Sequence, residues 1–196
     1  MGKRRIIVGV TGASGLPLSV QCLKIIRESS GYESVLIVSD SAETTLAWET
    51  GMTLGDLQGL ADTVFRPQEI GAGPASGSYQ SEGMIIVPCS MKTLGGIHAG
   101  YAGNLLLRAA DVTIKEQRPL VLAVREAPLS PIHLRNMQEL SMMPGVRIIP
   151  PVMQFYGGCR TIEEMSYAVC ARMLMPFGIE APRYRPWTGL EGYDAI

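Results

Sequence analysis

The distribution of hydrophobic positions divides the chain into short apolar runs that alternate with longer amphipathic segments. The short runs are rich in β-branched residues, which is typical of strands buried on both faces of a sheet. We expect strands at Ile6–Val10, Ser34–Val38, Met84–Val87, Pro119–Val124 and Val146–Ile149. The amphipathic segments predict helices at Leu16–Arg27, Ser41–Glu49, Leu54–Ala61, Asn104–Glu116, Ile132–Met142 and Ile162–Leu174. This order predicts an α/β fold in which an open, mostly parallel sheet carries helices on both faces.

The composition indicates one domain with a large apolar surface. The 196 residues are 46% hydrophobic and 18% charged, and we expect a single domain over residues 1–196. This is more apolar surface than a monomer needs, so we expect the chain to form oligomers. The net charge is −1, and the basic cluster Lys3-Arg4-Arg5 directly precedes the first strand. We therefore expect no binding of nucleic acid.

Cysteine usage and hydropathy bear on metal binding and location. Cys22, Cys89, Cys159 and Cys170 show no C-x-x-C spacing, and the chain has only two histidines, so we expect no metal site. The apolar run after Arg5 is about five residues, shorter than the roughly 7–15 of a secretory signal. No segment is long enough to span a membrane. These features predict a cytoplasmic protein that does not enter membranes.

Two turns at predicted strand ends are candidate binding elements. Gly12 to Gly15 follow the first strand, and Ser90 to Thr93 follow the third. Open α/β sheets bind ligands at such carboxyl ends, where amides and hydroxyls suit a phosphate or a polar ring edge. The first turn lacks both the dinucleotide fingerprint and the lysine of a P-loop, so a plain structural turn remains the alternative.

The loop from Arg66 to Glu82 is the other candidate, because loops of this length are usually functional or mobile. It contains Ala75-Ser76-Gly77-Ser78-Tyr79, whose amides and hydroxyls suit a phosphate. A flexible surface loop is the alternative.

Taken together and in order, the motifs resemble one known family. They are GVTGASG, VSD, WET, ASGS, GMIIVPCSMKTLGGI, NLLLRAADV, IKE, VREAPL and PPVMQFY, and the resemblance spans nearly the whole chain, from Ile6 to Trp187. The sequence is similar to the UbiX/Pad1 flavin prenyltransferases over this span. The resemblance implies a Rossmann-like flavoprotein that attaches a dimethylallyl group from dimethylallyl monophosphate to N5 and C6 of reduced flavin mononucleotide (FMN). It also implies a homododecamer with flavin sites between subunits, whose product serves a UbiD-type decarboxylase.

The resemblance also implies roles for individual residues. Flavin contacts are expected from Gly12, Ala13, Ser14, Ser39, Ser90, Met91, Lys92, Thr93 and Arg125. The prenyl phosphate is expected to face Ser76, Gly77, Ser78, Arg108, Lys115, Tyr156, Arg172 and Trp187. Catalytic roles fall to Ser14, Glu49, Lys115 and Glu126.

The residue types suit this chemistry. Cations neutralise a leaving phosphate, and apolar walls such as Trp187 keep water away from an allylic cation. The resemblance implies that Ser14 and Glu49 manage protons near N5. The apolar setting between Trp48 and Thr50 favours a raised pKa for Glu49, with a surface glutamate at a helix end as the alternative.

Further alternatives and one departure stay open. The chain has no Asp-rich motif for magnesium pyrophosphate, so we expect metal-independent transfer from a monophosphate. The segment Gly157-Gly158-Cys159-Arg160 departs from the family's polar, proline-containing stretch, which bears on donor preference. Flavin-dependent cysteine decarboxylases share the fold type but carry a histidine near the first helix, whereas this chain has none before His98. An FMN-binding accessory subunit of an aromatic-acid decarboxylase, without prenyl transfer, is the non-enzymatic alternative.

Overall fold

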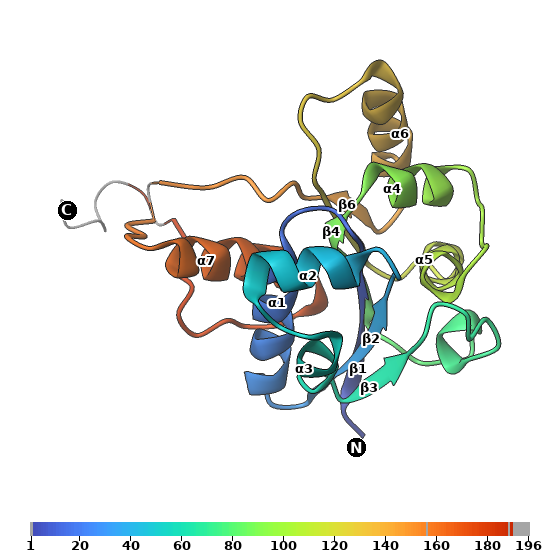
Figure 1. Cartoon of the computed structure of the whole chain (residues 1–196), viewed down its shortest axis with the longest axis horizontal. Coiled ribbons are helices and arrows are strands. Elements are labelled where there is room, and N and C mark those ends of the chain that lie inside the picture. Colours follow the sequence, from blue (N-terminus) through green and yellow to red (C-terminus); the bar gives the residue numbers. More distant parts are fainter. Residues whose placement is uncertain (1, 156, 188, 190–196) are drawn as a thin grey trace.

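The computed structural model describes residues 2–155, 157–187 and 189 (Figure 1). Its strands are β1 (Arg4–Val10), β2 (Tyr32–Val38), β3 (Thr63–Phe65), β4 (Gly83–Cys89), β5 (Leu120–Val124) and β6 (Val146–Ile148). Its α-helices are α1 (Leu16–Glu28), α2 (Ala42–Thr50), α3 (Leu54–Gln58), α4 (Met91–His98), α5 (Leu105–Lys115), α6 (Pro131–Ser141) and α7 (Ile162–Leu174). Short 3₁₀ helices lie before β4 at Gly73–Ala75 and after α7 at Met175–Phe177. The expected α/β fold is confirmed.

The strands form one parallel sheet with the order β3-β2-β1-β4-β5-β6. β1 pairs with β2 from Arg4↔Tyr32 to Val10↔Val38, and with β4 from Ile6↔Gly83 to Gly9↔Ile86. The order reverses between β1 and β4, and ligands of open α/β sheets bind at the carboxyl ends beside such a reversal. The topology therefore points to the turns that follow β1 and β4.

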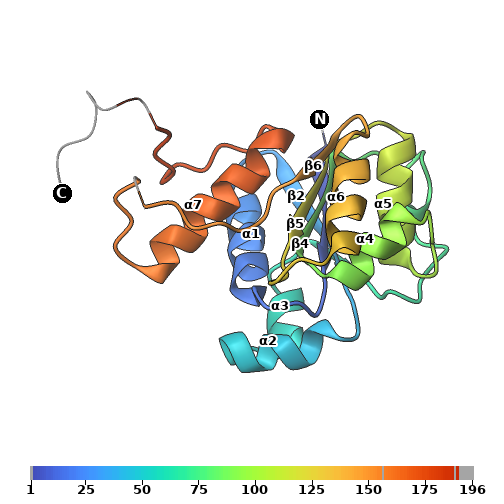
Figure 2. The ribbon, with the colours of Figure 1, turned by 90° about the horizontal axis from the view of Figure 1, so that it is seen from above.

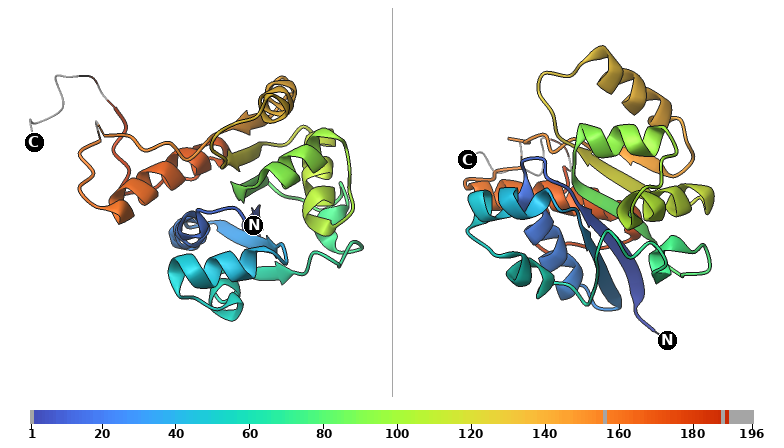
Figure 3. Two further views of the ribbon diagram at one scale, coloured as in Figure 1. Left: turned by 45° about the horizontal axis from the view of Figure 1, so that its top comes forward. Right: turned by 45° about the vertical axis from the view of Figure 1, so that its right-hand side comes forward.

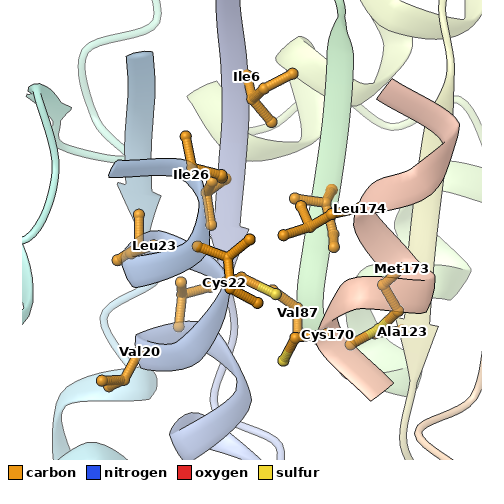
Figure 4. Close-up of a cluster of buried hydrophobic side chains, with 14 of the residues drawn as sticks. Ile6, Val20, Cys22, Leu23, Ile26, Val87, Ala123, Cys170, Met173 and Leu174 are labelled. Carbon is orange, nitrogen blue, oxygen red and sulfur yellow. The ribbon is translucent and has the colours of Figure 1, made fainter. Parts of the chain in front are cut away.

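Both faces of the sheet are covered, because successive residues of a strand point to opposite sides. Ile6 and Val8 of β1 join the cluster under α1 and α7, whereas Ile7 joins the cluster under α4, α5 and α6. Figure 2 shows these two layers of helices on either side of the sheet. In the first cluster, Cys22 of α1 and Cys170 of α7 lie near Val87 of β4 (Figure 4). This core fixes α1, and hence the turn that precedes it, against the sheet.

Two elements differ from the pattern-based expectation. The turn expected at Ser90–Thr93 opens helix α4, whose Leu94 and Ile97 are buried. Gly95 and Gly96 lower the helix propensity of this segment, so the sequence pattern did not predict α4. A Cβ on Gly96 would lie 3.1 Å from Leu107 of α5. The glycine thus allows α4 and α5 to approach closely. The edge strand β3 was also missed, because its three residues are too few for an alternating pattern.

The last part of the chain extends away from the sheet. Figures 1 and 3 show α7 and the segment before it reaching outward from the sheet. This segment exposes large apolar side chains, with Val152 and Phe155 each 71% exposed and Ile162 83% exposed. No helix in the part of the chain that the structure describes is long and apolar enough to cross a bilayer.

Candidate functional site

The turn after β1 is packed tightly against the start of α2. A Cβ on Gly12 would lie 2.6 Å from the carbonyl oxygen of Ser41, so only glycine fits this position. Thr45 of α2 donates a 3.1 Å hydrogen bond to the Gly12 carbonyl. Gly15 adopts a left-handed conformation with φ of 116°, which glycine takes readily. The conformation of the turn is therefore held from two sides.

Glu49, at the end of α2, binds the start of α1. Its Oε2 accepts 2.8 Å hydrogen bonds from the backbone N–H groups of Gly15 and Leu16. The Ser14 hydroxyl also hydrogen-bonds this carboxyl, and the positive charge of Arg125 acts on it. Three segments distant in sequence thus come together at the carboxyl edge of the sheet.

The electrostatics of Glu49 correct the sequence-based expectation. Burial of the carboxyl acts to raise its pKa, but the hydrogen bonds from Ser14, Gly15 and Leu16 and the charge of Arg125 outweigh it. The pKa therefore lies below its ordinary value of 4.5, and the expected raised pKa is wrong. The sequence pattern could not show these hydrogen bonds, and the apolar neighbour Trp48, on which the expectation rested, is 87% exposed. At neutral pH Glu49 is a carboxylate able to accept a proton.

The second turn is built around Ser90, which caps α4. Its hydroxyl accepts from the Thr93 amide at 3.3 Å and lies 3.1 Å from the Thr93 hydroxyl. Met91 begins the helix, and the Lys92 side chain is exposed. The Arg125 amide bonds to the Cys89 carbonyl at 3.1 Å, which brings the ends of β4 and β5 together. Hydroxyls and cations suitable for a phosphate or a polar ring edge thus gather here.

The remaining residues expected at this edge lie nearby. The Ser39 amide donates to the Val10 carbonyl at 2.9 Å, which places Ser39 beside the end of β1. Its hydroxyl lies 3.3 Å from that of Ser41. Ala13 lies half-buried within the first turn, and Glu126 is exposed directly after Arg125. The structure thus places every expected flavin residue, with Glu49 and Glu126, at one edge of the sheet.

A second group of expected residues lies around α5 and the loop before β4. The Lys115 ammonium pairs with Glu116, and a Cβ on Gly77 would lie 2.8 Å from the lysine nitrogen. The Arg108 side chain donates to the Ala75 carbonyl at 3.1 Å. The Ser76 and Ser78 hydroxyls lie 2.9 Å apart.

Sequence reasoning missed Arg118, which fixes this loop. Its guanidinium donates to the carbonyls of Gly77 and Tyr79, both at 2.8 Å. Arg118 lies two residues before β5, whereas Arg125 directly follows it, so the five-residue strand separates the two groups by roughly 16 Å. The second group therefore lies toward the amino edge of the sheet. Within one chain, Lys115 and the loop at Ser76–Ser78 do not meet Glu49 or Glu126.

The third group of expected residues belongs to the end of the chain. Arg172, exposed on α7, contributes to a cavity of about 680 Å³ under the segment that follows β6. Ile149, Pro150, Val152, Met153, Gln154, Phe155, Val169 and Tyr184 complete its lining. Trp187 is 47% exposed beyond α7, and Tyr156 lies outside the described residues. The volume suits a small ligand, and Arg172 supplies a cation.

Within the described residues, no three His, Cys, Asp or Glu side chains gather in a way that could hold a metal ion. The donors at the carboxyl edge are hydroxyls, amides and cations, a set that fits an anionic organic ligand.

Comparison with known proteins defines the class. The family model described as Flavoprotein matches residues 1–174. A probable UbiX-like flavin prenyltransferase of Streptomyces sp. (strain D7) is 47% identical over 97% of this chain and 95% of its own length. The crystal structure of AnUbiX (PadA1) in complex with FMN and dimethylallyl pyrophosphate superposes with a TM-score of 0.92 at 42% identity, covering 95% of this chain and 98% of that one.

A second solved structure agrees. The dodecameric FMN-dependent UbiX-like decarboxylase of Escherichia coli O157:H7 superposes with a TM-score of 0.91 at 48% identity, and the match covers 94% of this chain and 100% of that one. The fold is that of a flavoprotein. Within that class, the chain belongs to the family of UbiX-like flavin prenyltransferases, as the sequence motifs predicted.

Proposed function

We propose that this chain is a flavin prenyltransferase that attaches a dimethylallyl group to N5 and C6 of reduced FMN. The observation that carries the proposal is the Glu49 carboxylate at the carboxyl edge of the sheet, which the Gly15 and Leu16 amides and the Ser14 hydroxyl bind and on which the charge of Arg125 acts. The resemblance of the sequence motifs implies family roles for Ser14, Glu49 and Arg125, and the comparisons support the same reaction. We further propose that residues 1–196 act as a single domain.

FMN would be held by the turns at the carboxyl edge. Gly12 lets the first turn pack against Ser41. Hydroxyls from Ser39, Ser90 and Thr93 suit the polar edges of FMN. Lys92 and Arg125 add positive charge, while Ala13 and Met91 supply apolar surface. When bound in its reduced form, FMN supplies the nucleophilic N5 and C6.

Ser14 and Glu49 would move protons beside the flavin. The lowered pKa keeps Glu49 ionised, so its carboxylate can accept a proton through the Ser14 hydroxyl. The hydrogen bonds from Gly15 and Leu16 fix the carboxylate while it does so.

A separate cationic set would stabilise the leaving phosphate as its bond to the allylic carbon breaks. Lys115, Arg108 and Arg172 provide positive charge, and Glu126 can share a proton with a phosphate oxygen. The loop at Ser76–Ser78 and the Tyr156 hydroxyl would add donors, and Trp187 an aromatic wall. We propose dimethylallyl monophosphate as the donor, with transfer independent of metal.

Because one chain keeps Lys115 away from Glu49, we propose that neighbouring copies complete each site. The apolar side chains exposed around Phe155 and at Trp48 favour burial against such copies. A homododecamer is proposed, since the similar Escherichia coli protein is dodecameric. A cytoplasmic location is also proposed, and the free thiols of Cys22, Cys89, Cys159 and Cys170 support it.

The product would pass to a UbiD-type decarboxylase. The test is to incubate the protein anaerobically with reduced FMN and dimethylallyl monophosphate, remove it by ultrafiltration, and add the filtrate to an apo-decarboxylase of that type. Activation by the protein-free filtrate supports the transferase. Activation only when the protein itself is present would support the accessory-subunit alternative instead.

A further inference from the structure

The turns after β1 and β4 are joined by a buried threonine of the GVTGASG motif, for which the resemblance implies no role. The Thr11 hydroxyl donates to the Pro88 carbonyl at 2.7 Å and accepts from the Ser90 amide at 3.0 Å. Its side chain sits between the two turns, and the residue is 1% exposed. Thr11 immediately precedes Gly12, and Ser90 opens the second turn.

These bonds lie where the pairing of β1 with β4 stops, whereas the pairing of β4 with β5 resumes at Cys89↔Val124. The pairing of β1 with β4 ends at Gly9↔Ile86, and the register of β4 against β5 shifts between Ile86 and Cys89. Beyond Ile86, side-chain hydroxyls bind the β4 backbone instead.

Ser19 of α1 supplies a second such hydroxyl. It is fully buried and donates to the Val87 carbonyl at 2.6 Å. Figure 4 shows Val87 facing α1 within the core. Hydroxyls of the β1–α1 unit therefore hydrogen-bond to two consecutive carbonyls of β4, those of Val87 and Pro88, just before the second turn.

We infer that Thr11 is a positioning residue for flavin binding, which sets the distance between the first turn, Gly12–Gly15, and the second, Ser90–Thr93. The inference rests on the proposed function, because it takes both turns as flavin contacts. The hydroxyl acts as donor to one backbone group and acceptor from another, so no aliphatic residue replaces it. Ser19 assists by holding the residue before Pro88.

The test compares Thr11→Val with Thr11→Ser. Valine keeps the shape of threonine but removes both hydrogen bonds, whereas serine keeps the hydroxyl. Binding of oxidised FMN, followed by quenching of its fluorescence, should weaken about tenfold in Thr11→Val, as expected for the loss of a satisfied buried hydroxyl. Thr11→Ser should bind within about threefold of the unaltered protein.

Thr113→Val is the matched control. Thr113 is also 1% exposed, and its hydroxyl donates to the Ala109 carbonyl of its own helix at 2.7 Å, remote from the turns. It should lose thermal stability comparably but keep FMN affinity. Equal FMN affinity in Thr11→Val and Thr113→Val would overturn the inference and leave Thr11 a purely structural residue.

If Thr11→Val does not fold, Ser19→Ala provides the second variant. Loss of its hydrogen bond to Val87 should weaken FMN binding by about threefold. Unchanged FMN affinity would show that the hydrogen bonds to the end of β4 do not position the second turn for flavin. Failure of the unaltered protein to bind FMN would instead remove the proposed function itself, so the two failures are distinguishable.

Discussion

The Glu49 carboxylate, at the end of α2, accepts a 2.8 Å hydrogen bond from the backbone N–H of Gly15, at the start of α1. One side chain therefore performs two tasks. It caps the helix whose preceding turn is the candidate flavin contact, and it presents an ionised oxygen to Ser14.

Glu49→Gln separates these tasks, because glutamine can still accept the backbone hydrogen bonds but cannot accept a proton. We expect prenyl transfer to fall at least about 100-fold, the scale of general-base loss, with FMN binding retained. Single-turnover assays and FMN titration measure the two quantities. Glu43→Gln, an exposed change in the first turn of the same helix, is the control and should transfer normally. Normal transfer by Glu49→Gln would contradict the proton-transfer role.

The same carboxylate predicts a pH dependence of stability. Since the folded pKa of Glu49 lies below its ordinary 4.5, its stabilising contribution is complete above that value and is lost as pH falls through the folded pKa. The thermal midpoint of the unaltered protein should therefore drop more between pH 6 and about pH 3 than that of Glu49→Gln. Parallel pH profiles for the two proteins would show that Glu49 does not contribute in this way.

The opposite placement of Glu49 and Lys115 predicts complementation between inactive variants. Glu49→Gln and Lys115→Ala should each be inactive, but co-expression should restore activity in about a quarter of the sites, because copies mix within a symmetric oligomer. The measurement is transfer activity of the purified mixed oligomer. Mixed assemblies as inactive as either variant would place both residues in one chain's site.

The fold was largely predictable, because β1, β4 and β5 are buried on both faces and leave continuous apolar runs. The contacts of Glu49 were not, since they join residues 34 positions apart and depend on how α2 lies across the start of α1. From the motifs, Lys115 and Glu126 were expected to face the same ligand. Only the direction of α5 and β5 revealed that they lie toward opposite edges of the sheet.

Burial predicts which cysteines react. Burial raises the pKa of the Cys89 thiol to about 12 and that of Cys170 well above its ordinary value. Cys22 is equally buried, whereas Cys159 is partly exposed. Iodoacetamide at neutral pH should modify Cys159 alone in the folded protein, and all four after denaturation, as read by peptide mass. Modification of Cys22 or Cys170 as fast as Cys159 would contradict the packing of α1 on α7.

The exposed apolar segment before α7 predicts that a charge placed there dissociates the proposed oligomer. Phe155→Asp adds a charge to a side chain that is 71% exposed in one chain, so the protomer should fold while the large assembly dissociates. Light scattering coupled to gel filtration measures the mass. Lys24→Asp, an exposed change on α1, is the control. Retention of the full assembly by Phe155→Asp would show that this segment does not join copies.

The mass of the flavin after reaction shows whether the protein transfers a prenyl group. The protein is incubated anaerobically with reduced FMN and dimethylallyl monophosphate, and a parallel sample receives dimethylallyl diphosphate. The mass of the extracted flavin is measured by mass spectrometry. We expect a flavin heavier by one dimethylallyl unit with the monophosphate, and FMN of unchanged mass with Lys115→Ala. FMN that binds tightly but keeps its mass with either donor would contradict the prenyl-transfer account.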